Sequence, residues 1–371
     1  MKALGLILAG GNNNRMRELS NKRAIAAMPV GGSFRCIDFA LSNMSNSHIQ
    51  KVAVLTQYNA RSLNEHLSSS KWWDFGRKQG GLYVFTPTVT SDNSWWYRGT
   101  ADAIYRNIDF LKRCHEPYVI ITSGDCVYKM DYNEVLDYHI SKKADITVVC
   151  RDMGPEEDDV CRFGIVRMNE DSRIVEFEEK PMVARSNTVS TGIYVIRRRA
   201  LIEMLEKCAE EARWDFVTDI LIRYKNLKRI YGYKMTGYWS NIATVESYYK
   251  TNMDFLKEDV RNYMFRSEPK IYSKIDDLPP AQYNTVVKNS LVSSGCILNS
   301  KVENSVLFKN VFVGKNCVIK NSIILNDVYI GDNTHIENCI VESRGTLNAN
   351  TYYCGDNGVK VVVEHNERYV F

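Results

Sequence analysis

Apolar residues recur about every six positions through the C-terminal part of the chain, at Val292, Ile297, Val302, Val306, Val313, Val318, Ile324, Ile330, Ile336 and Val341. Between them lie mostly small residues or asparagines, at Asn299, Ser300, Asn304, Asn310, Asn316, Asn321, Asn326, Asn333 and Asn338. This period is typical of hexapeptide β-helices, in which each strand and turn buries one apolar side chain inside a triangular coil. Asparagine tolerates the left-handed backbone of tight corners. The pattern favours a parallel β-helix over residues 286–371 rather than an ordinary antiparallel β domain. The faces and edges of such a stack must be capped or paired, so it also predicts an oligomer.

The first 256 residues alternate between strand-like and helix-like segments, which is typical of an α/β domain. Strands are expected at Val52–Thr56, Leu82–Phe85, Tyr118–Thr122, Ile146–Cys150, Gly164–Met168, Ile174–Phe177, Thr191–Ile196 and Ile230–Lys234. Helices are expected at Phe39–Met44, Ser62–Phe75, from Ala101 onward, Ala200–Ala212 and Asp215–Leu227. The pattern predicts a Rossmann-like domain with a mixed, mainly parallel sheet. Residues 257–285 lack periodicity and contain three prolines, as expected of a linker between two domains.

The chain opens with the apolar run Leu6–Leu8, followed by Gly10 and Gly11. A buried strand that breaks at two glycines into a loop begins many nucleotide-binding α/β domains. Here the loop continues with three asparagines, whose side chains take space that a phosphate would need. The glycines alone leave open a strand–turn–helix without a ligand. Asp125, just past the strand Tyr118–Thr122, either lies on the ligand-binding edge of the sheet or caps the next segment.

Composition excludes several classes of protein. The net charge of +4 includes no basic run dense enough for a nucleic-acid footprint. No segment is apolar enough to span a membrane, and the N-terminal apolar run is too short for a secretion signal, so we expect a cytoplasmic protein. The ten cysteines form no CxxC pairs and the six histidines show no ligand spacing, so we expect buried thiols and no zinc site.

Longer strings carry a resemblance to bacterial glucose-1-phosphate adenylyltransferase (ADP-glucose pyrophosphorylase). They are LILAGG, NKRA, GGSFRCIDFALSN, TQY, WYRGTADA, GDCVYKMDY, EKP, GIYV and LPPA, in order along nearly the whole chain. The resemblance implies an N-terminal nucleotidyltransferase domain, which joins ATP to glucose 1-phosphate. It also implies a C-terminal left-handed parallel β-helix that takes part in tetramer assembly and regulation. Mg²⁺ held by two aspartates is the cofactor that the family uses.

The resemblance assigns sugar-phosphate roles residue by residue. Lys180 matches the lysine that binds the phosphate of glucose 1-phosphate, and Glu179 matches an acceptor for a sugar hydroxyl. Other matches on this side are Ser190, Tyr194, Asp215, Phe216 and the pocket-wall residue Trp239. Tyr97, Arg98 and Gly99 match the loop that closes near the adenine. Lys22 lies in the string that resembles the family's activator-sensing region.

The triphosphate and metal side departs from the family pattern. Gly10, Gly11 and Arg15 of the nucleotide loop are kept, as is the first metal-binding aspartate, Asp125. Asn13 and Asn14 replace glycine and threonine, Ile25 and Ala26 replace lysine and proline, and Asn241 replaces the second metal aspartate, with Ala243 in place of a glycine. One preorganised electrostatic group is commonly worth roughly 10²–10³ in rate, so these losses together predict little activity.

This pattern resembles the GlgD-type subunit, which occurs beside a catalytic GlgC-type subunit. The resulting prediction is a subunit that is weak or inactive alone and activates a GlgC-type partner in a heterotetramer; a homo-oligomer is the alternative assembly. Glucose 1-phosphate, and ATP as a second candidate, are the expected ligands, and Mg²⁺ binding is in doubt. A self-sufficient adenylyltransferase and a non-enzymatic sugar-phosphate regulator stay open as alternatives. A nucleotidyltransferase for another sugar or base is disfavoured by WYRGTADA and IDFALSN.

Overall fold

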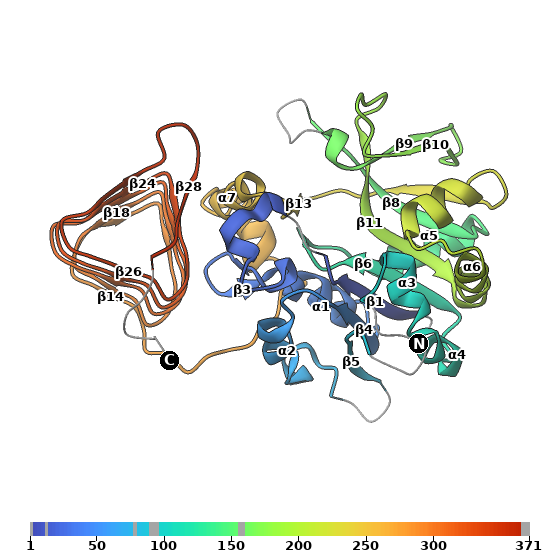
Figure 1. The fold of residues 1–371 in the computed structure, drawn as a ribbon, viewed down its shortest axis with the longest axis horizontal. Helices are drawn as coiled ribbons and strands as arrows, with labels where there is room; N and C mark the ends of the chain where they lie inside the picture. Colours follow the sequence, from blue (N-terminus) through green and yellow to red (C-terminus); the bar gives the residue numbers. More distant parts are fainter. Residues whose placement is uncertain (1–2, 12–13, 77–79, 89–95, 155–159, 365–371) are drawn as a thin grey trace.

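The computed structural model describes residues 3–11, 14–76, 80–88, 96–154 and 160–364. An α/β domain and a triangular β-helix lie side by side, and the chain crosses between them in a long connection (Figure 1). No helix within the described ranges is long and apolar enough to cross a membrane.

The α/β domain is built on a nine-stranded mixed sheet with the order β10-β9-β11-β6-β1-β4-β5, in which β8 also pairs with β11 and β12. Its strands are β1 (Ala3–Ala9), β4 (Lys51–Thr56), β5 (Gly81–Phe85), β6 (Tyr118–Ser123), β8 (Ile146–Asp152), β9 (Gly164–Met168), β10 (Ile174–Glu179), β11 (Thr188–Arg197) and β12 (Ile230–Lys234). The central strands β6, β1, β4 and β5 are parallel, with Leu6 opposite both Ala53 and Ile121. Two small ribbons pair β2 (Pro29–Val30) with β3 (Phe34–Arg35), and β7 (Cys126–Tyr128) with β13 (Trp239–Asn241).

Helices cover both faces of the sheet, so the domain has three layers. The helices are α1 (Cys36–Asn46), α2 (Arg61–Leu67), α3 (Thr100–Tyr105), α4 (Ile108–Arg113), α5 (Tyr132–Ser141), α6 (Arg198–Glu210), α7 (Val245–Asp254) and α8 (Glu258–Arg261). Short 3₁₀ turns are η1 (Asn14–Ser20), η2 (Ile25–Ala27), η3 (Ser70–Trp73) and η4 (Val160–Arg162), and π turns are η5 (Val217–Ile222) and η6 (Asn262–Arg266). Alternation in β1 explains the layering, because Ile7 joins the apolar core under α1, α2 and α5, whereas Leu4 and Leu6 join the core under α3, α4 and α6.

Two predicted helices differ from the structure. The segment Ser62–Phe75 is not one helix, because α2 ends at Leu67 and a separate turn, η3, follows. The indole nitrogen of Trp73 donates to the backbone oxygen of Tyr272 at 3.1 Å, and this contact directs the second turn toward the linker. The segment Asp215–Leu227 contains a π turn at Val217–Ile222 rather than a continuous α-helix.

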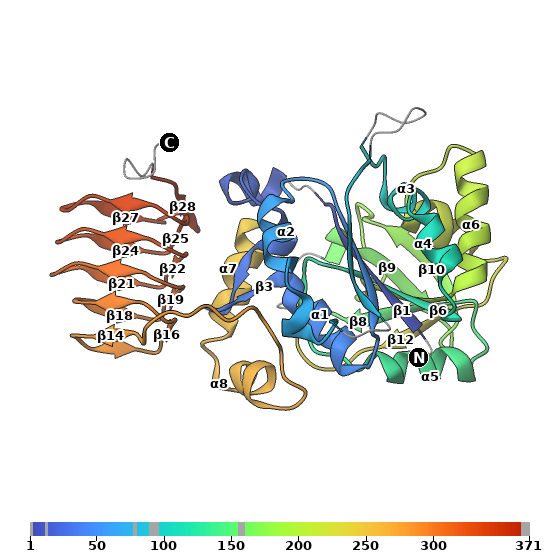
Figure 2. The same ribbon diagram turned by 90° about the horizontal axis from the view of Figure 1, so that it is seen from below.

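The β-helix has three parallel five-stranded sheets, which form the sides of the triangle (Figures 1 and 2). They are β14-β17-β20-β23-β26, β15-β18-β21-β24-β27 and β16-β19-β22-β25-β28. Their strands are β14 (Gln282–Tyr283), β15 (Val287–Lys288), β16 (Leu291–Val292), β17 (Ile297–Leu298), β18 (Lys301–Glu303), β19 (Val306–Leu307), β20 (Phe312–Val313), β21 (Val318–Lys320), β22 (Ile323–Ile324), β23 (Tyr329–Ile330), β24 (His335–Glu337), β25 (Cys339–Val341), β26 (Thr346–Leu347), β27 (Tyr352–Cys354) and β28 (Lys360–Val362). Left-handed corners occur at the predicted Asn304, Asn310, Asn316, Asn321, Asn333 and Asn338. The β-helix is therefore confirmed, in its left-handed form.

The six-residue reading of the β-helix was wrong at three positions. Ile297 and Val318 face outward, and the next residues, Leu298 and Ile319, fill the coil interior. Val306 faces the α/β domain, and Leu307 points inward. Bonded corner residues lie 15 apart in the early coils and 17 apart in the later ones, so a strict period of six slips out of phase.

Residues 257–285 are partly structured. They contain α8 and η6, and at their end β14 already pairs with β17 of the next coil. The buried ammonium of Lys129 donates to the backbone oxygens of Tyr263 and Ser267, both at 2.8 Å. This contact attaches the start of the connection to the α/β domain.

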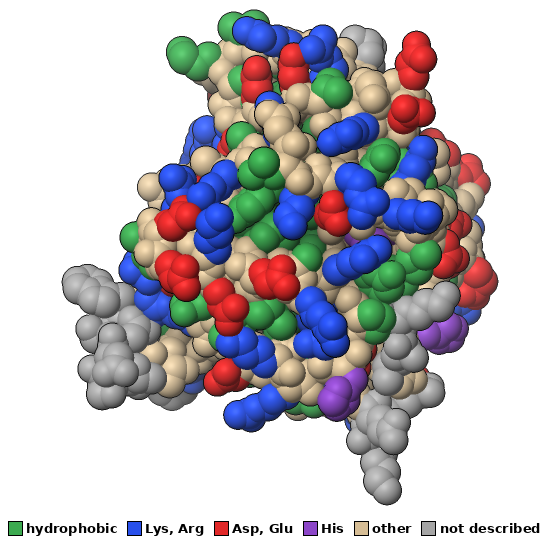
Figure 3. Space-filling model, turned by 90° about the vertical axis from the view of Figure 1, so that its right-hand side faces the viewer, with side chains coloured by type: hydrophobic (Ala, Val, Ile, Leu, Met, Phe, Trp, Pro, Cys, Tyr) green, Lys and Arg blue, Asp and Glu red, His purple; other side chains and the backbone are tan. Residues whose placement is uncertain are grey.

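The face that carries α4 and α6 has mixed charge. Lysines and arginines are interspersed with acidic side chains (Figure 3), and Lys112 of α4 pairs with Glu206 of α6 at 2.6 Å. This face has no single-sign stripe of the kind that tracks a nucleic-acid backbone.

Candidate active site

The carboxyl ends of three parallel strands bring the predicted nucleotide side together. Gly10 follows β1, Gln57 follows β4, and Asp125 follows β6. A Cβ atom on Gly10 would lie 3.2 Å from that of Gln57, so the first glycine permits the close approach of the two loops. Gly11 is exposed, with open space around it. Such an edge is where open α/β sheets bind ligands.

The replaced positions of the phosphate loop lie in different surroundings. Asn13 falls outside the described residues. Asn14 and Arg15 are exposed at the start of η1, and Asn14 lines a polar hollow of about 440 Å³. Ile25 and Ala26 are buried, and Ile25 belongs to an apolar cluster that includes Met16 and Leu19. Position 25 therefore faces a core rather than open solvent.

The two positions of the family's metal aspartates are adjacent. The β7–β13 ribbon sets Asn241 opposite Cys126, and the backbone N–H of Ile242 donates to the Asp125 carbonyl at 2.8 Å. Ser123 Oγ donates to Asp125 Oδ1 at 2.5 Å, and the Cys126 thiol donates to the same oxygen at 3.4 Å. Asn241 Nδ2 donates to Cys126 Sγ at 3.3 Å. These hydrogen bonds connect four side chains in a row, from Ser123 through Asp125 and Cys126 to Asn241, and we call this group the Asp125 cluster.

The Asp125 cluster does not fit the family's magnesium site. Mg²⁺ prefers hard, anionic oxygen ligands in octahedral geometry, and here one carboxylate faces a neutral amide and a thiol. Burial, and then the Asp125 charge, raise the pKa of the Cys126 thiol well above its ordinary value, so the thiol stays protonated and can donate. Within the described ranges, no group of three or more His, Cys, Asp or Glu side chains could hold a metal ion.

The predicted sugar-phosphate residues Glu179, Lys180 and Asp215 lie near one another. Lys180 Nζ is 3.3 Å from Glu179 Oε1, and the Lys180 side chain is 66% exposed. Lys180 has a left-handed backbone (φ 46°), and its N–H donates to the Phe163 carbonyl at 3.2 Å. Burial raises the pKa of Glu179, Lys180 opposes that shift, and the charge of Asp215 adds to it. The cation therefore stands at the mouth of the site, with carboxylates beside it.

Aromatic side chains form the base of this region. The rings of Tyr194 and Phe216 are 5.2 Å apart, and the Tyr194 hydroxyl lies 3.5 Å from Ser190 Oγ. The Trp239 ring meets the Phe163 ring edge to face at 5.4 Å, and its buried indole N–H has no hydrogen-bond partner among the residues that the structure describes. Unpaired buried donors are rare, so this N–H is a candidate contact for a ligand oxygen.

The sugar and metal sides meet where β11 lies beside β6. Gly192 of β11 has φ +75°, at a register shift between Ser190 and Tyr194. A Cβ atom at Gly192 would lie 3.6 Å from that of Ser123, one residue before the Gly124–Asp125 turn. The shift therefore sets the sugar side next to the metal side, and such bulges are frequent next to active sites.

The predicted adenine-side loop is firmly attached to the domain. Tyr97 exchanges hydrogen bonds with the Gln57 side chain through its backbone N–H (3.0 Å) and carbonyl (3.4 Å). The Arg98 guanidinium lies 3.3 Å over the Trp214 ring and pairs with buried Asp102 at 3.1 Å. A Cβ atom on Gly99 would come within 2.4 Å of the Trp214 carbonyl, so only glycine allows this packing.

Sequence reasoning missed three contributors to the site. Phe163 links Lys180 to Trp239, Cys126 sits inside the Asp125 cluster, and Arg23 pairs with Glu342 of the β-helix at 2.5 Å. Cys126 and Arg23 lie within the GDCVYKMDY and NKRA strings, so these strings could have pointed to them. Predicted Lys22, beside Arg23, is exposed.

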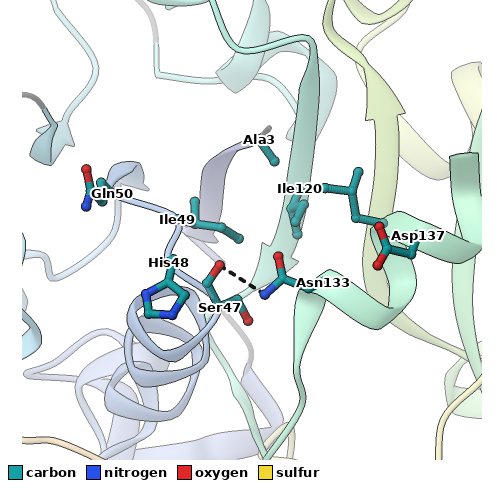
Figure 4. A pocket seen from close by; sticks show the side chains of 9 residues that line it. Ala3, Ser47, His48, Ile49, Gln50, Ile120, Asn133 and Asp137 are labelled. Carbon is teal, nitrogen blue, oxygen red and sulfur yellow. Dashed lines mark hydrogen bonds between the residues drawn. The ribbon is translucent and has the colours of Figure 1, made fainter. Parts of the chain in front are cut away.

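A separate cavity of about 480 Å³ lies at the opposite, amino-terminal end of the parallel strands (Figure 4). Its lining includes Ala3, Ile49 and Ile120, with Ser47 and Asn133 at its polar wall. Asn133 Nδ2 donates to the Ser47 carbonyl at 3.2 Å. The lining contains none of the predicted site residues, so the cavity is distinct from the candidate active site.

Comparisons with known proteins agree with this architecture. Residues 4–258 match the nucleotidyl transferase family, and residues 279–358 match the GlmU-like C-terminal hexapeptide family. A glucose-1-phosphate adenylyltransferase of Pseudothermotoga lettingae is 42% identical over 86% of this chain and 76% of that protein. Enzymes of the same name from Clostridium perfringens and Clostridium acetobutylicum are each 42% identical over 85% of this chain, and over 81% and 84% of their own lengths. The chain therefore belongs to the glucose-1-phosphate adenylyltransferase family.

Proposed function

We propose that this chain is a GlgD-type subunit of glucose-1-phosphate adenylyltransferase, the enzyme that converts ATP and glucose 1-phosphate to ADP-glucose and pyrophosphate. It is weak or inactive alone and raises the activity of a catalytic GlgC-type partner in a mixed tetramer. The observation that carries the proposal is the Asp125 cluster, in which the neutral amide of Asn241 bonds to the Cys126 thiol beside the single carboxylate of Asp125.

The reaction explains why this cluster matters. A phosphate oxygen of the sugar attacks the α-phosphorus of ATP, and pyrophosphate leaves, so negative charge must be neutralised on the triphosphate. In this chain Asn241 supplies no charge, and its amide bonds to Cys126 instead. Ile25, where the family has a lysine, is packed in a core. Both features support a chain that binds a triphosphate poorly and turns it over slowly.

The sugar side supports retained ligand binding. The ammonium of Lys180 is exposed and would pair with the phosphate of glucose 1-phosphate, while the Glu179 carboxylate would accept from a sugar hydroxyl. The Tyr194 and Phe216 rings would support the apolar face of the sugar. We infer that the site holds glucose 1-phosphate in the orientation used by the family, without completing the transfer.

The decisive experiment compares ADP-glucose formation by the purified chain, by a GlgC-type partner, and by the two co-expressed. We expect the chain alone to be at least about 10²-fold slower than the partner, and the co-purified complex to exceed the partner alone. Turnover of the chain alone at the partner's rate would contradict the proposal in favour of a self-sufficient enzyme. Failure to co-purify, together with unchanged partner kinetics, would favour an independent regulator.

A further inference from the structure

The segment between the nucleotide loop and α1, residues 14–35, lies against the β-helix; we call it the phosphate arm. It contains η1, η2 and the β2–β3 ribbon, and it lies on the side of the α/β domain that faces the β-helix, close to α7 (Figure 2). Its first residues, Asn14 and Arg15, belong to the nucleotide side of the cleft.

A buried ion pair joins the arm to the β-helix. Arg23 Nη2 lies 2.5 Å from Glu342 Oε1, and Arg23 Nη1 donates to Ser343 Oγ at 3.2 Å. The two charged side chains are only 14% and 9% exposed. Removing one partner of a buried pair leaves an uncompensated charge, which is far more costly than the loss of a surface pair.

Apolar contacts surround the pair. Ile25, Met16 and Leu19 of the arm share one cluster with Val306, Ile323 and Ile340, which project from the facing sheet of the β-helix. At the other end of the arm, Ser293 Oγ donates to the Gly32 carbonyl at 2.6 Å. Gly32 has φ +85°, and a Cβ there would lie 2.8 Å from Ser293 Oγ.

A second cation makes Glu342 harder to replace. Burial lowers the pKa of Arg35, Asp38 opposes that shift, and the nearby charge of Arg23 lowers the pKa further. Arg35 is also tied to the Ser62 carbonyl at 2.9 Å. Without Glu342, the guanidinium groups of Arg23 and Arg35 would remain close together with less compensating negative charge. Their repulsion would then favour displacement of the arm.

We propose that Arg23 and Glu342 are positioning residues that let the β-helix set the position of the phosphate arm, and with it the side of the cleft that carries Asn14 and Arg15. A displacement of the β-helix face then displaces the nucleotide loop as well, because one ion pair and the shared core connect them. This coupling is a property of the single chain and does not depend on whether a partner is activated.

Hydrogen–deuterium exchange of the purified full-length chain tests the coupling. In Glu342→Gln, peptides covering residues 14–35 should exchange on the order of 10²-fold faster than in wild type, while peptides covering residues 312–330 keep their protection. Glu303→Gln, which removes the partly buried partner of the exposed Lys288 in the same β-helix, is the matched control and should leave the arm unchanged. The charge swap Arg23→Glu with Glu342→Arg should restore part of the arm's protection.

Three outcomes would overturn the proposal. The first is arm exchange in Glu342→Gln within twofold of the Glu303→Gln control. The second is equal loss of protection throughout the β-helix, which would make Glu342 a residue of the β-helix fold alone. The third is a swap variant no better protected than Glu342→Gln.

Discussion

The sugar side and the metal side of the candidate site differ in how their polar side chains are hydrogen-bonded. On the sugar side, Lys180 stands largely exposed, Glu179 is held beside it, and the Trp239 N–H has no partner among the described residues. On the metal side, Ser123, Cys126 and Asn241 bond to Asp125 or to one another. Groups left without a protein partner are ready for a ligand, whereas groups that satisfy one another have no need of one.

This difference is what the proposed function expects of a chain that keeps the sugar side and loses the metal side within a single fold. In the Asp125 cluster an amide stands where the resemblance places a carboxylate, and this amide donates to the neighbouring Cys126 thiol. The β7–β13 ribbon that carries the cluster is regularly paired. The proposed loss of chemistry therefore requires only a change of side chains and their hydrogen-bond partners.

Restoring the family residues should have the largest effect. The variant Asn13→Gly, Asn14→Thr, Ile25→Lys and Asn241→Asp returns the charged groups of the metal side, so ADP-glucose formation by the chain alone should rise about 10²-fold or more. The measurement is initial rate with ATP, glucose 1-phosphate and Mg²⁺. Adding Asp125→Asn to the same variant is the control and should abolish the gain. If the initial rate of the restored variant does not increase, the replaced residues are not the cause of low activity.

The second largest effect is expected when the exposed cation Lys180 is removed, because affinity for glucose 1-phosphate should fall. Lys180→Met deletes the group that would pair with the sugar phosphate, and affinity for glucose 1-phosphate by calorimetry should fall roughly 10- to 100-fold. Arg185→Met, in the same loop and paired only loosely with Glu178 at 4.0 Å, is the control. Equal affinities of wild type and Lys180→Met would remove the basis for calling this side a ligand site.

A single substitution on the metal side should strengthen the binding of a divalent cation. Asn241→Asp adds a second carboxylate next to Asp125, so Mn²⁺ affinity measured by electron paramagnetic resonance should increase about tenfold or more, or about 1.4 kcal/mol. Asn241→Ser, which adds no charge, should behave as wild type does. Tight Mn²⁺ binding by wild type that is lost in Asp125→Asn would break the contrast between the two sides.

The smallest expected effect is a pH dependence on the sugar side. Burial holds the pKa of Glu179 above its ordinary value, so the folded state binds this proton more tightly than the unfolded state does. The favourable contribution is complete below the unfolded pKa of 4.5 and is lost as pH rises through the raised folded value. Relative to Glu179→Gln, the melting temperature of wild type should therefore decline as pH rises above 4.5. The neighbouring variant Glu178→Gln should show the same dependence of melting temperature on pH as wild type. If Glu179→Gln shows it too, the pKa of Glu179 is not raised in the folded state.

Sequence patterns predicted an α/β fold followed by a β-helix and located most strands of the α/β sheet, because the buried strands are short apolar runs bounded by turn residues. They failed where tertiary contacts decide the outcome. Trp73 interrupts a helical segment by bonding to Tyr272, almost 200 residues away, and the change from 15- to 17-residue coils moves Ile297 and Val318 to the outside.

At the candidate site, the motif strings singled out Asp125 and Asn241 as matches to the family's two metal-binding positions, and the structure brings these residues close together across the β7–β13 ribbon. They could not show that Asn241 would bond to Cys126, since a hydrogen-bond partner depends on register between strands far apart in sequence. Nor could they show that Ile25 enters a core shared with the β-helix, because only the docked domains bring Ile323 and Ile340 beside it.

That shared core bears on whether the two domains can be separated. Ile25, Phe255 and Met264 on one side, and Val306 and Ile340 on the other, are buried in one cluster that both domains share. A fragment ending before the β-helix would expose an apolar face of the kind that causes aggregation. The family may be divided by sequence into two units, yet this chain should melt in one cooperative transition and tolerate neither half being expressed alone.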